Sequence, residues 1–211
     1  MNSLPRFFVI GRGWRAVAAP LVFCSICVLC SAVAQEHPAH EWSYSGSEGP
    51  AHWGELTPEF AACKTGHRQS PVNIVGAQSA DLPAIQFEYE PSALHIINNG
   101  HTIQIDYAPG SFIRVGDRRY ELKQFHFHHP SEETIKNKRF PMEVHLVHSD
   151  ADGNLAVVSV LLEEGSANPL VETLWGLAPK TAGPEKADDN LQINVADLSP
   201  ATRSCFTFPV R

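Results

Sequence analysis

The middle of the chain alternates between apolar and polar residues, the pattern of β-strands that bury one face in a core. Turn signals such as Gly100 and Gly116-Asp117 interrupt it at intervals of roughly eight to twelve residues. We therefore expect strands within the segments 85–89, 95–99, 102–106, 112–115, 119–128 and 143–147. The unbroken apolar run 155–162 predicts a central strand buried on both faces. The expected fold is mostly β, a single domain built on a large central, mostly antiparallel sheet.

Helical signals are few and short. The clearest helix is expected over 168–176, where Asn168 is a good N-cap and Pro169 suits the first helical turn. Segment 55–63 has room for one short helical turn. Segment 37–53 combines Gly, Ser, Pro and aromatic residues without a period, which indicates an extended N-terminal wrap.

Two of the expected strands carry histidines on one face. Side chains alternate along a strand, so His126 and His128 lie on the face opposite Phe125 and Phe127. His145 follows after a gap long enough for a loop and a return to a neighbouring strand. Three neutral imidazoles with one open position form the typical catalytic zinc site, whereas structural zinc sites close all four positions.

Two polar residues share a face with these histidines. Gln124 precedes His126 by two positions, and Glu143 precedes His145 by two. Each is placed to accept the spare ring N–H of its histidine and so fix the tautomer.

Histidines in strands also occur without a catalytic zinc. A single histidine in a strand is usually a packing or surface residue, and cupins and amidohydrolases also use His-x-His. A hydrolase of another β-sheet metalloenzyme family is disfavoured because no carboxylate base accompanies the ligands in the sequence. We interpret His129, His148 and His95 as surface or packing residues.

Residues 1–34 have the pattern of a signal peptide. Arg6, Arg12 and Arg15 form a positive region, residues 16–32 are apolar and uncharged, and Ala32-Val33-Ala34 is a small-x-small cleavage site. The apolar run is near the lower limit for a membrane span, so an uncleaved anchor is the alternative. We expect an exported protein, periplasmic or secreted, whose mature part is 35–211.

The charge argues against two classes of partner. The formal net charge is −7, and removing residues 1–34 takes away three Arg and no acid, giving −10. An acidic chain without a basic stripe is a poor ligand for nucleic acid or an anionic membrane surface. We expect a small-molecule substrate and no stable membrane insertion; the oligomeric state is open. Cys63 and Cys205 remain in the mature part. Two cysteines in an exported protein are compatible with a disulfide between them, but the sequence alone does not decide whether it forms.

Several motifs, taken together and in order, resemble the α-class carbonic anhydrases, and the exported bacterial type above all. They are Trp42-Ser43-Tyr44, His52-Trp53-Gly54, Gln69 to Ile74, Asn98 to Thr102, Gln124 to Glu132 and Glu143 to His148. The resemblance covers nearly all of 35–211. It implies a zinc enzyme, a lyase that reversibly hydrates carbon dioxide to bicarbonate and a proton by means of zinc-bound hydroxide.

The resemblance also implies roles for individual residues. The positions that match are the zinc ligands His126, His128 and His145, the acceptors Gln124 and Glu143, the proton shuttle His101, the acid Glu132 that acts behind a threonine, and the apolar substrate wall Val147 and Val157. A histidine suits the shuttle because its pKa lies near neutral pH.

The resemblance fails near the end of the chain. The family's threonine segment, which follows 198–204 in its members, has no counterpart, so we expect a domain lacking its C-terminal part. Glu132 is then expected to have no hydroxyl partner. The usual partner of Cys63 lies in that segment, and Cys205 stands at a position that is aromatic in the family, so the resemblance leaves a Cys63–Cys205 bridge open and does not imply it. The alternative function is a carbonic-anhydrase-like zinc-binding domain without turnover.

Overall fold

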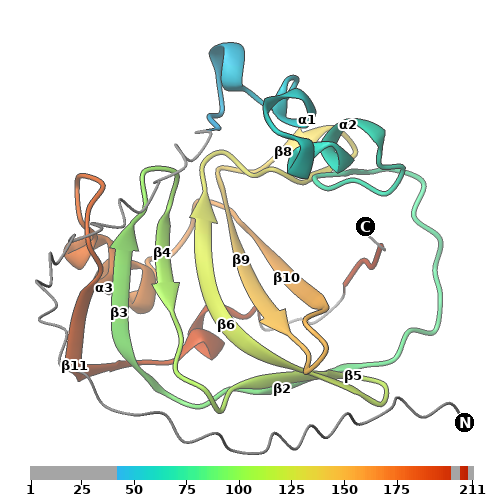
Figure 1. Ribbon diagram of the computed structural model, residues 1–211. Helices are drawn as coiled ribbons and strands as arrows, with labels where there is room; N and C mark the ends of the chain where they lie inside the picture. Colours follow the sequence, from blue (N-terminus) through green and yellow to red (C-terminus); the bar gives the residue numbers. More distant parts are fainter. Residues whose placement is uncertain (1–41, 201–204, 209–211) are drawn as a thin grey trace, which may run out of the picture. The chain divides into compact units, whose positions relative to one another are not determined.

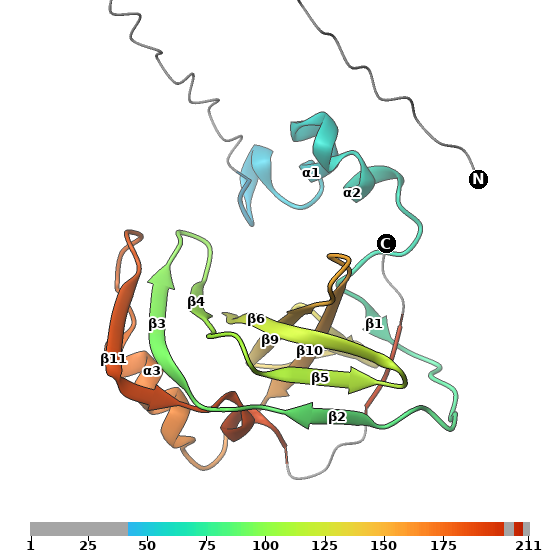
Figure 2. The same cartoon turned by 60° about the horizontal axis from the view of Figure 1, so that its bottom comes forward.

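A broad antiparallel sheet dominates the computed structural model, which describes residues 42–200 and 205–208 (Figure 1). The main path of this sheet runs β10-β9-β6-β4-β3-β11, and β5 joins β6 while β2 joins β5 (Figure 2). Its strands are β2 (Ile85–Glu88), β3 (Ser92–Asn98), β4 (Ile103–Asp106), β5 (Phe112–Val115), β6 (Arg118–His128), β9 (Met142–Ser149), β10 (Leu155–Leu162) and β11 (Lys186–Ile193). Every pairing within it is antiparallel. The predicted mostly β fold is confirmed.

The remaining elements are short. A small sheet joins β1 (Asn73–Ile74), β7 (Thr134–Ile135) and β8 (Lys138–Arg139). The helices are η1 (Gly46–Glu48), α1 (Trp53–Leu56), η2 (Pro58–Phe60), α2 (Ala62–Thr65), α3 (Pro169–Leu177) and η3 (Val195–Leu198). The predicted cap of α3 is present, because the Asn168 side chain accepts the backbone N–H groups of Leu170 and Val171.

One face of the sheet forms the hydrophobic core with α3 and η3. Leu174 of α3 and Val195 of η3 are fully buried there against Phe125 of β6 and Val144 of β9. The side chains that complete this cluster are Leu94, Ile96, Ile105, Tyr107, Leu122, Phe127, Leu146, Leu170, Ile193 and Leu198. His126 and His128 of β6 and His145 of β9 therefore project from the opposite face, whereas His148 of β9 shares the core face with Val144 and Leu146.

A β-bulge at Lys123 sets which residues of β6 face the core. The β6–β9 register pairs Leu122 with His148 and then Gln124 with Val147, so Lys123 has no partner in that register. Leu122 and Phe125 are both fully buried although they are three positions apart, which a regular strand does not allow.

Strand β10 corrects one expectation. The apolar run 155–162 predicted a strand buried on both faces, but within the described residues β10 pairs only with β9 and lies at the edge of the sheet. Leu155 is 66% exposed and Val157 49% exposed because no described element covers them. Composition alone does not distinguish a central strand from an apolar edge.

No helix within residues 42–200 or 205–208 has the length and apolar character needed to cross a bilayer. The predicted signal peptide, 1–34, lies outside the described residues and stays a prediction.

Candidate metal centre

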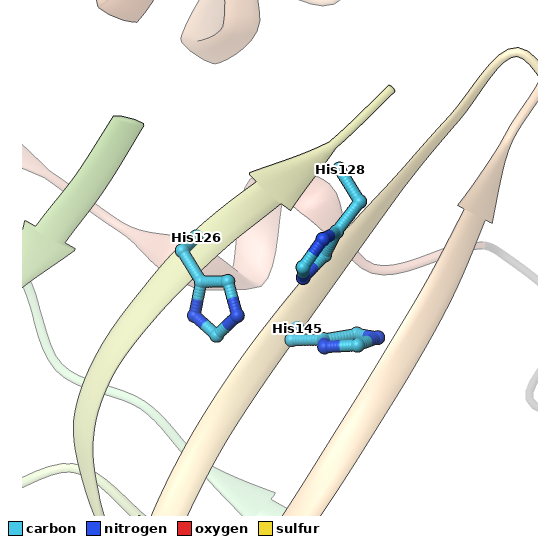
Figure 3. Close-up of side chains that lie close together, drawn as sticks. All are labelled: His126, His128 and His145. Atoms are coloured by element: carbon cyan, nitrogen blue, oxygen red, sulfur yellow. The ribbon is translucent and has the colours of Figure 1, made fainter. Parts of the chain in front are cut away.

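Three histidines from neighbouring strands lie together on the face of the sheet opposite the core (Figure 3). His126 of β6 is directly opposite His145 of β9 in the register, and His128 lies two residues further along β6. Their ring centroids are 4.5–5.4 Å apart. One nitrogen from each ring lies within 4.8 Å of the others. Strand parity and register alone bring the three donors together.

The two histidines of β6 each keep an Nε2 atom available for a metal. His126 engages Gln124 through Nδ1, at 2.8 Å from Oε1, so Nδ1 carries the proton and Nε2 stays free as a lone-pair donor. The Nε2 atom of His128 is buried and has no hydrogen-bond partner among the described residues. A buried polar atom normally has a partner, so this orphaned nitrogen fits a site that takes a metal.

His145 has the opposite orientation. Its Nε2 atom lies 3.4 Å from Oε1 of Glu143 and 3.4 Å from Oε2 of Glu133, so the proton belongs on Nε2 and Nδ1 is left to bind. Two Nε2 donors and one Nδ1 donor, all imidazole, match the ligands that zinc prefers in catalytic sites. The residues present therefore fit zinc.

Burial and mutual repulsion keep the β6 histidines in their ligand form. Desolvation, with a smaller contribution from neighbouring histidines, lowers the pKa of His126 and of His128 to about 4. Both rings are therefore neutral near pH 7, which leaves their lone pairs available to a metal.

His145 responds differently to its surroundings. Burial acts to lower its pKa, but hydrogen bonds and charges from Glu133 and Glu143 outweigh burial and raise the pKa to about 9. For Glu133, burial is likewise outweighed by hydrogen bonds, among them those donated by His145 and Ser70, which lower the pKa to about 2. The pair of carboxylates thus favours positive charge at this ring.

Glu132 lies between a ligand and the N-terminal segment. Its Oε1 atom is 3.4 Å from Nδ1 of His128, and it forms a hydrogen bond with the Tyr44 hydroxyl. Burial raises the pKa of Glu132, and burial together with Glu132 raises the pKa of Tyr44 to about 12. The expectation that Glu132 has no hydroxyl partner was wrong. The missed partner is far away in sequence, and only the fold brings it near.

His101 stacks on an indole. Its ring lies 3.9 Å from the Trp42 ring, centroid to centroid, with an interplanar angle of 11°. Its backbone N–H donates to Oδ1 of Asn99, and Gly100 before it has φ +92°, a conformation suited to glycine. The turn that carries His101 is thus held by local hydrogen bonds.

The remaining predicted site residues divide into two groups. Val147 and Val157 are opposite each other in the β9–β10 register, where Val147 is half-buried and Val157 more exposed. Cys63 and Cys205 are both exposed free thiols, so the bridge between them is not formed in this structure.

Sequence reasoning assigned no role to Glu133, Ser70 or Tyr44. Glu133 is adjacent to an assigned residue, but a pair of consecutive acids usually marks a solvated surface. Ser70 donates to Oε1 of Glu133 at 2.9 Å from a loop far back in the chain. No local pattern predicts such a contact.

Comparisons with known proteins agree with this geometry. The sequence model of the eukaryotic-type carbonic anhydrase family matches residues 48–209. A carbonic anhydrase of Neisseria gonorrhoeae is 43% identical over 183 residues, covering 86% of this chain and 71% of the relative. A carbonic anhydrase of Nostoc sp. is 40% identical over 174 residues, covering 79% of this chain and 65% of the relative.

A solved structure supports the fold independently. The α-carbonic anhydrase of Thermovibrio ammonificans, solved with the inhibitor sulfanilamide, superposes with a TM-score of 0.75 and 40% identity, covering 78% of this chain and 73% of that one. The chain spans roughly two thirds to three quarters of the length of these proteins. The family match, the relatives and the shared fold agree, and this protein belongs to the eukaryotic-type, or α-class, carbonic anhydrase family.

Proposed function

We propose that this chain binds zinc through His126, His128 and His145 and catalyses the reversible hydration of carbon dioxide to bicarbonate and a proton. The observation that carries the proposal is the convergence of three imidazole donors, one of them a buried nitrogen without a partner among the described residues. Zinc held by three neutral ligands keeps its full charge and lowers the pKa of bound water to about 7, which supplies a nucleophile at neutral pH.

The protein's own residues orient and tune the site. Gln124 holds the His126 ring through Nδ1, and Glu143 lies at the Nε2 atom of His145, so each ring presents a defined nitrogen. The low pKa of His126 and His128 reduces the competition of protons with the metal for these rings. Val147 and Val157 offer apolar surface on the adjacent strands, which suits a small uncharged substrate.

We assign the removal of the product proton to His101. An imidazole is suited to this role because its ordinary pKa lies near neutral pH. Its stacking on Trp42 gives the ring a defined resting position near the chain's N-terminal segment. The non-catalytic alternative is not favoured, because the relatives above are named carbonic anhydrases and the three-histidine group is intact.

Stopped-flow measurement of carbon dioxide hydration by the zinc-loaded chain tests the proposal, with His145→Ala as the control. We expect turnover above the buffer rate that disappears in the control. Zinc binding without turnover would select the non-catalytic alternative, and no zinc binding would reject both.

We also propose that the protein is exported, on the basis of the composition of residues 1–34. Fractionation of expressing bacteria, with the intact mass of the recovered protein, tests this. Full-length protein retained in the cytoplasm would contradict it.

A further inference from the structure

Two buried carboxylates meet at a single ring nitrogen in this structure. Oε1 of Glu143 and Oε2 of Glu133 each lie 3.4 Å from Nε2 of His145. Glu143 is fully buried and Glu133 is 4% exposed, so both carboxylates are largely shielded from bulk water. Only the contact to Glu133 has hydrogen-bond geometry, because Oε1 of Glu143 is buried without a hydrogen-bond partner among the described residues. Glu143 alone therefore does not fix the tautomer of the ring.

The other oxygens of the two carboxylates are already occupied. Oε2 of Glu143 accepts the backbone N–H groups of Glu132 and Glu133, at 2.9 and 3.1 Å. Oε1 of Glu133 accepts the Ser70 hydroxyl at 2.9 Å. Each carboxylate is thus anchored by one oxygen and directs the other at His145. Glu133 is held in place by a residue from a remote loop and does not simply fill space.

We propose that Glu133 is a second positioning residue for the metal ligand His145, accepting the Nε2 N–H beside Glu143 and adding its negative charge to the metal centre. The inference rests on the proposed function, because the larger part of its effect appears only when a cation binds Nδ1 of the same ring.

The charges of the two carboxylates need compensation. Two neighbouring buried carboxylates repel each other and are costly to bury unless a positive charge lies nearby. A divalent cation on the far side of the imidazole supplies that charge, and the polarised N–H transmits the interaction to both carboxylates. In the metal-free chain a proton on His145, which the two carboxylates favour, supplies part of that charge. Glu133 should therefore stabilise both forms of the chain, and the metal-bound form more, because the divalent cation carries the larger charge.

Glu133→Gln tests this, because it removes the charge, keeps the shape and keeps an oxygen for Ser70. The zinc dissociation constant is measured on the full chain by competition with a chelator, and metal-free thermal denaturation is measured in parallel. We expect the dissociation constant to rise about 10-fold or more, as is usual when a partner of a metal-ligating histidine is removed, with one zinc per chain throughout. The melting temperature of the metal-free variant should fall, because the pair with protonated His145 is weakened, and added zinc should raise it by less than it raises that of the unaltered chain.

The matched control is Glu88→Gln, which removes the same charge from an exposed ion pair with Arg114, between β2 and β5. It should leave zinc affinity unchanged. As a spectroscopic measure, the visible absorption of the cobalt-loaded chain should change in Glu133→Gln and not in Glu88→Gln, since it reports the geometry of the ligands.

Several results would overturn the inference. An unchanged zinc affinity in Glu133→Gln, or a lower melting temperature of the metal-free variant at constant affinity, would make Glu133 merely structural. Glu133→Asp keeps the charge but is shorter, so it should also weaken zinc binding; failure of both variants to fold without metal would equally assign a structural role.

The same experiment separates this inference from the proposed function. If the unaltered chain binds no zinc, or if His145→Ala binds it equally well, the proposed function fails. If zinc binds through His145 but Glu133→Gln binds it as tightly, only the role of Glu133 fails.

Discussion

The imidazole of His101 lies flat against the indole of Trp42, with 3.9 Å between ring centroids. Trp42 in turn meets Tyr44 and Trp53 edge to face, at 5.3 and 5.2 Å. The N-terminal segment thus forms an aromatic platform that touches the proposed proton acceptor through Trp42 and the acid Glu132 through Tyr44.

His101→Ala should slow carbon dioxide hydration in dilute buffer by about 100-fold, the lower end of what a positioned acid–base group contributes. The loss should be recovered in concentrated imidazole buffer, because a dissolved base can accept the proton in place of the side chain. Rates that fall equally in every buffer would contradict a role in proton transfer.

His148 is predicted to make stability sensitive to acid. It is fully buried between the Tyr89 hydroxyl, 2.9 Å from Nε2, and the Ala156 carbonyl oxygen, 3.1 Å from Nδ1. Burial lowers its pKa from 6.5 to about 4, so the folded chain does not bind a proton that the unfolded chain binds below pH 6.5. Stability should therefore be fully present above that pH and be lost as the pH falls toward 4.

Urea denaturation of the metal-free chain at about pH 7.5 and about pH 5 measures this loss. The unaltered chain should lose about 2 kcal/mol more between these conditions than His148→Gln, which does not titrate. The other histidines are common to both proteins and cancel in the comparison. Equal losses would show that His148 titrates normally in the folded state.

Asn168 has two separable roles. Its Oδ1 caps α3, and its Nδ2 donates to the Asp197 carbonyl oxygen in η3 at 2.8 Å. Asn168→Ala should lower the free energy of unfolding by about 1 to 2 kcal/mol, since both interactions disappear. Asn168→Asp keeps the cap and loses only the link to η3, so its thermal midpoint should fall between those of the unaltered chain and the alanine variant. A midpoint as low as that of alanine would mean that the cap contributes little.

Deletion of Lys123 should prevent the native fold. Without the bulge, Leu122 and Phe125 cannot both face the core. Exposing one such side chain costs about 1.5 to 3 kcal/mol. The other core-facing residues on the same side of the deletion would also turn to the opposite face of the sheet. Lys123→Ala keeps the bulge and should change stability by less than about 0.5 kcal/mol. Circular dichroism and thermal melting compare the two; a deletion variant that melts like the alanine variant would show that the bulge is dispensable.

The parts of the site that follow local rules could be predicted, and the parts that depend on distant contacts could not. Alternation along β6 and β9 was enough to place His126, His128 and His145 on one face with Gln124 and Glu143. The bulge at Lys123 did not disturb this prediction because it precedes the ligands.

The contacts that sequence reasoning missed join remote segments. Ser70 reaches Glu133, and Tyr44 reaches Glu132, through loops whose course follows from the whole fold. The apolar run of β10 was misread for a related reason. Burial of a strand depends on its neighbours in the sheet, and its own composition does not report whether it has one neighbour or two.

The edge position of β10 also bears on how molecules of this protein meet one another. The strand carries no charge and no proline over Leu155–Leu162, the two features with which proteins commonly block sheet-to-sheet joining. Its outer backbone, unpaired within the part of the chain that the structure describes, and its exposed Leu155 and Val157 offer a template for an extended segment of another chain. Such an added strand would be separated from His145 of β9 by β10 alone, so self-association at this edge would bring a second chain close to the metal ligands.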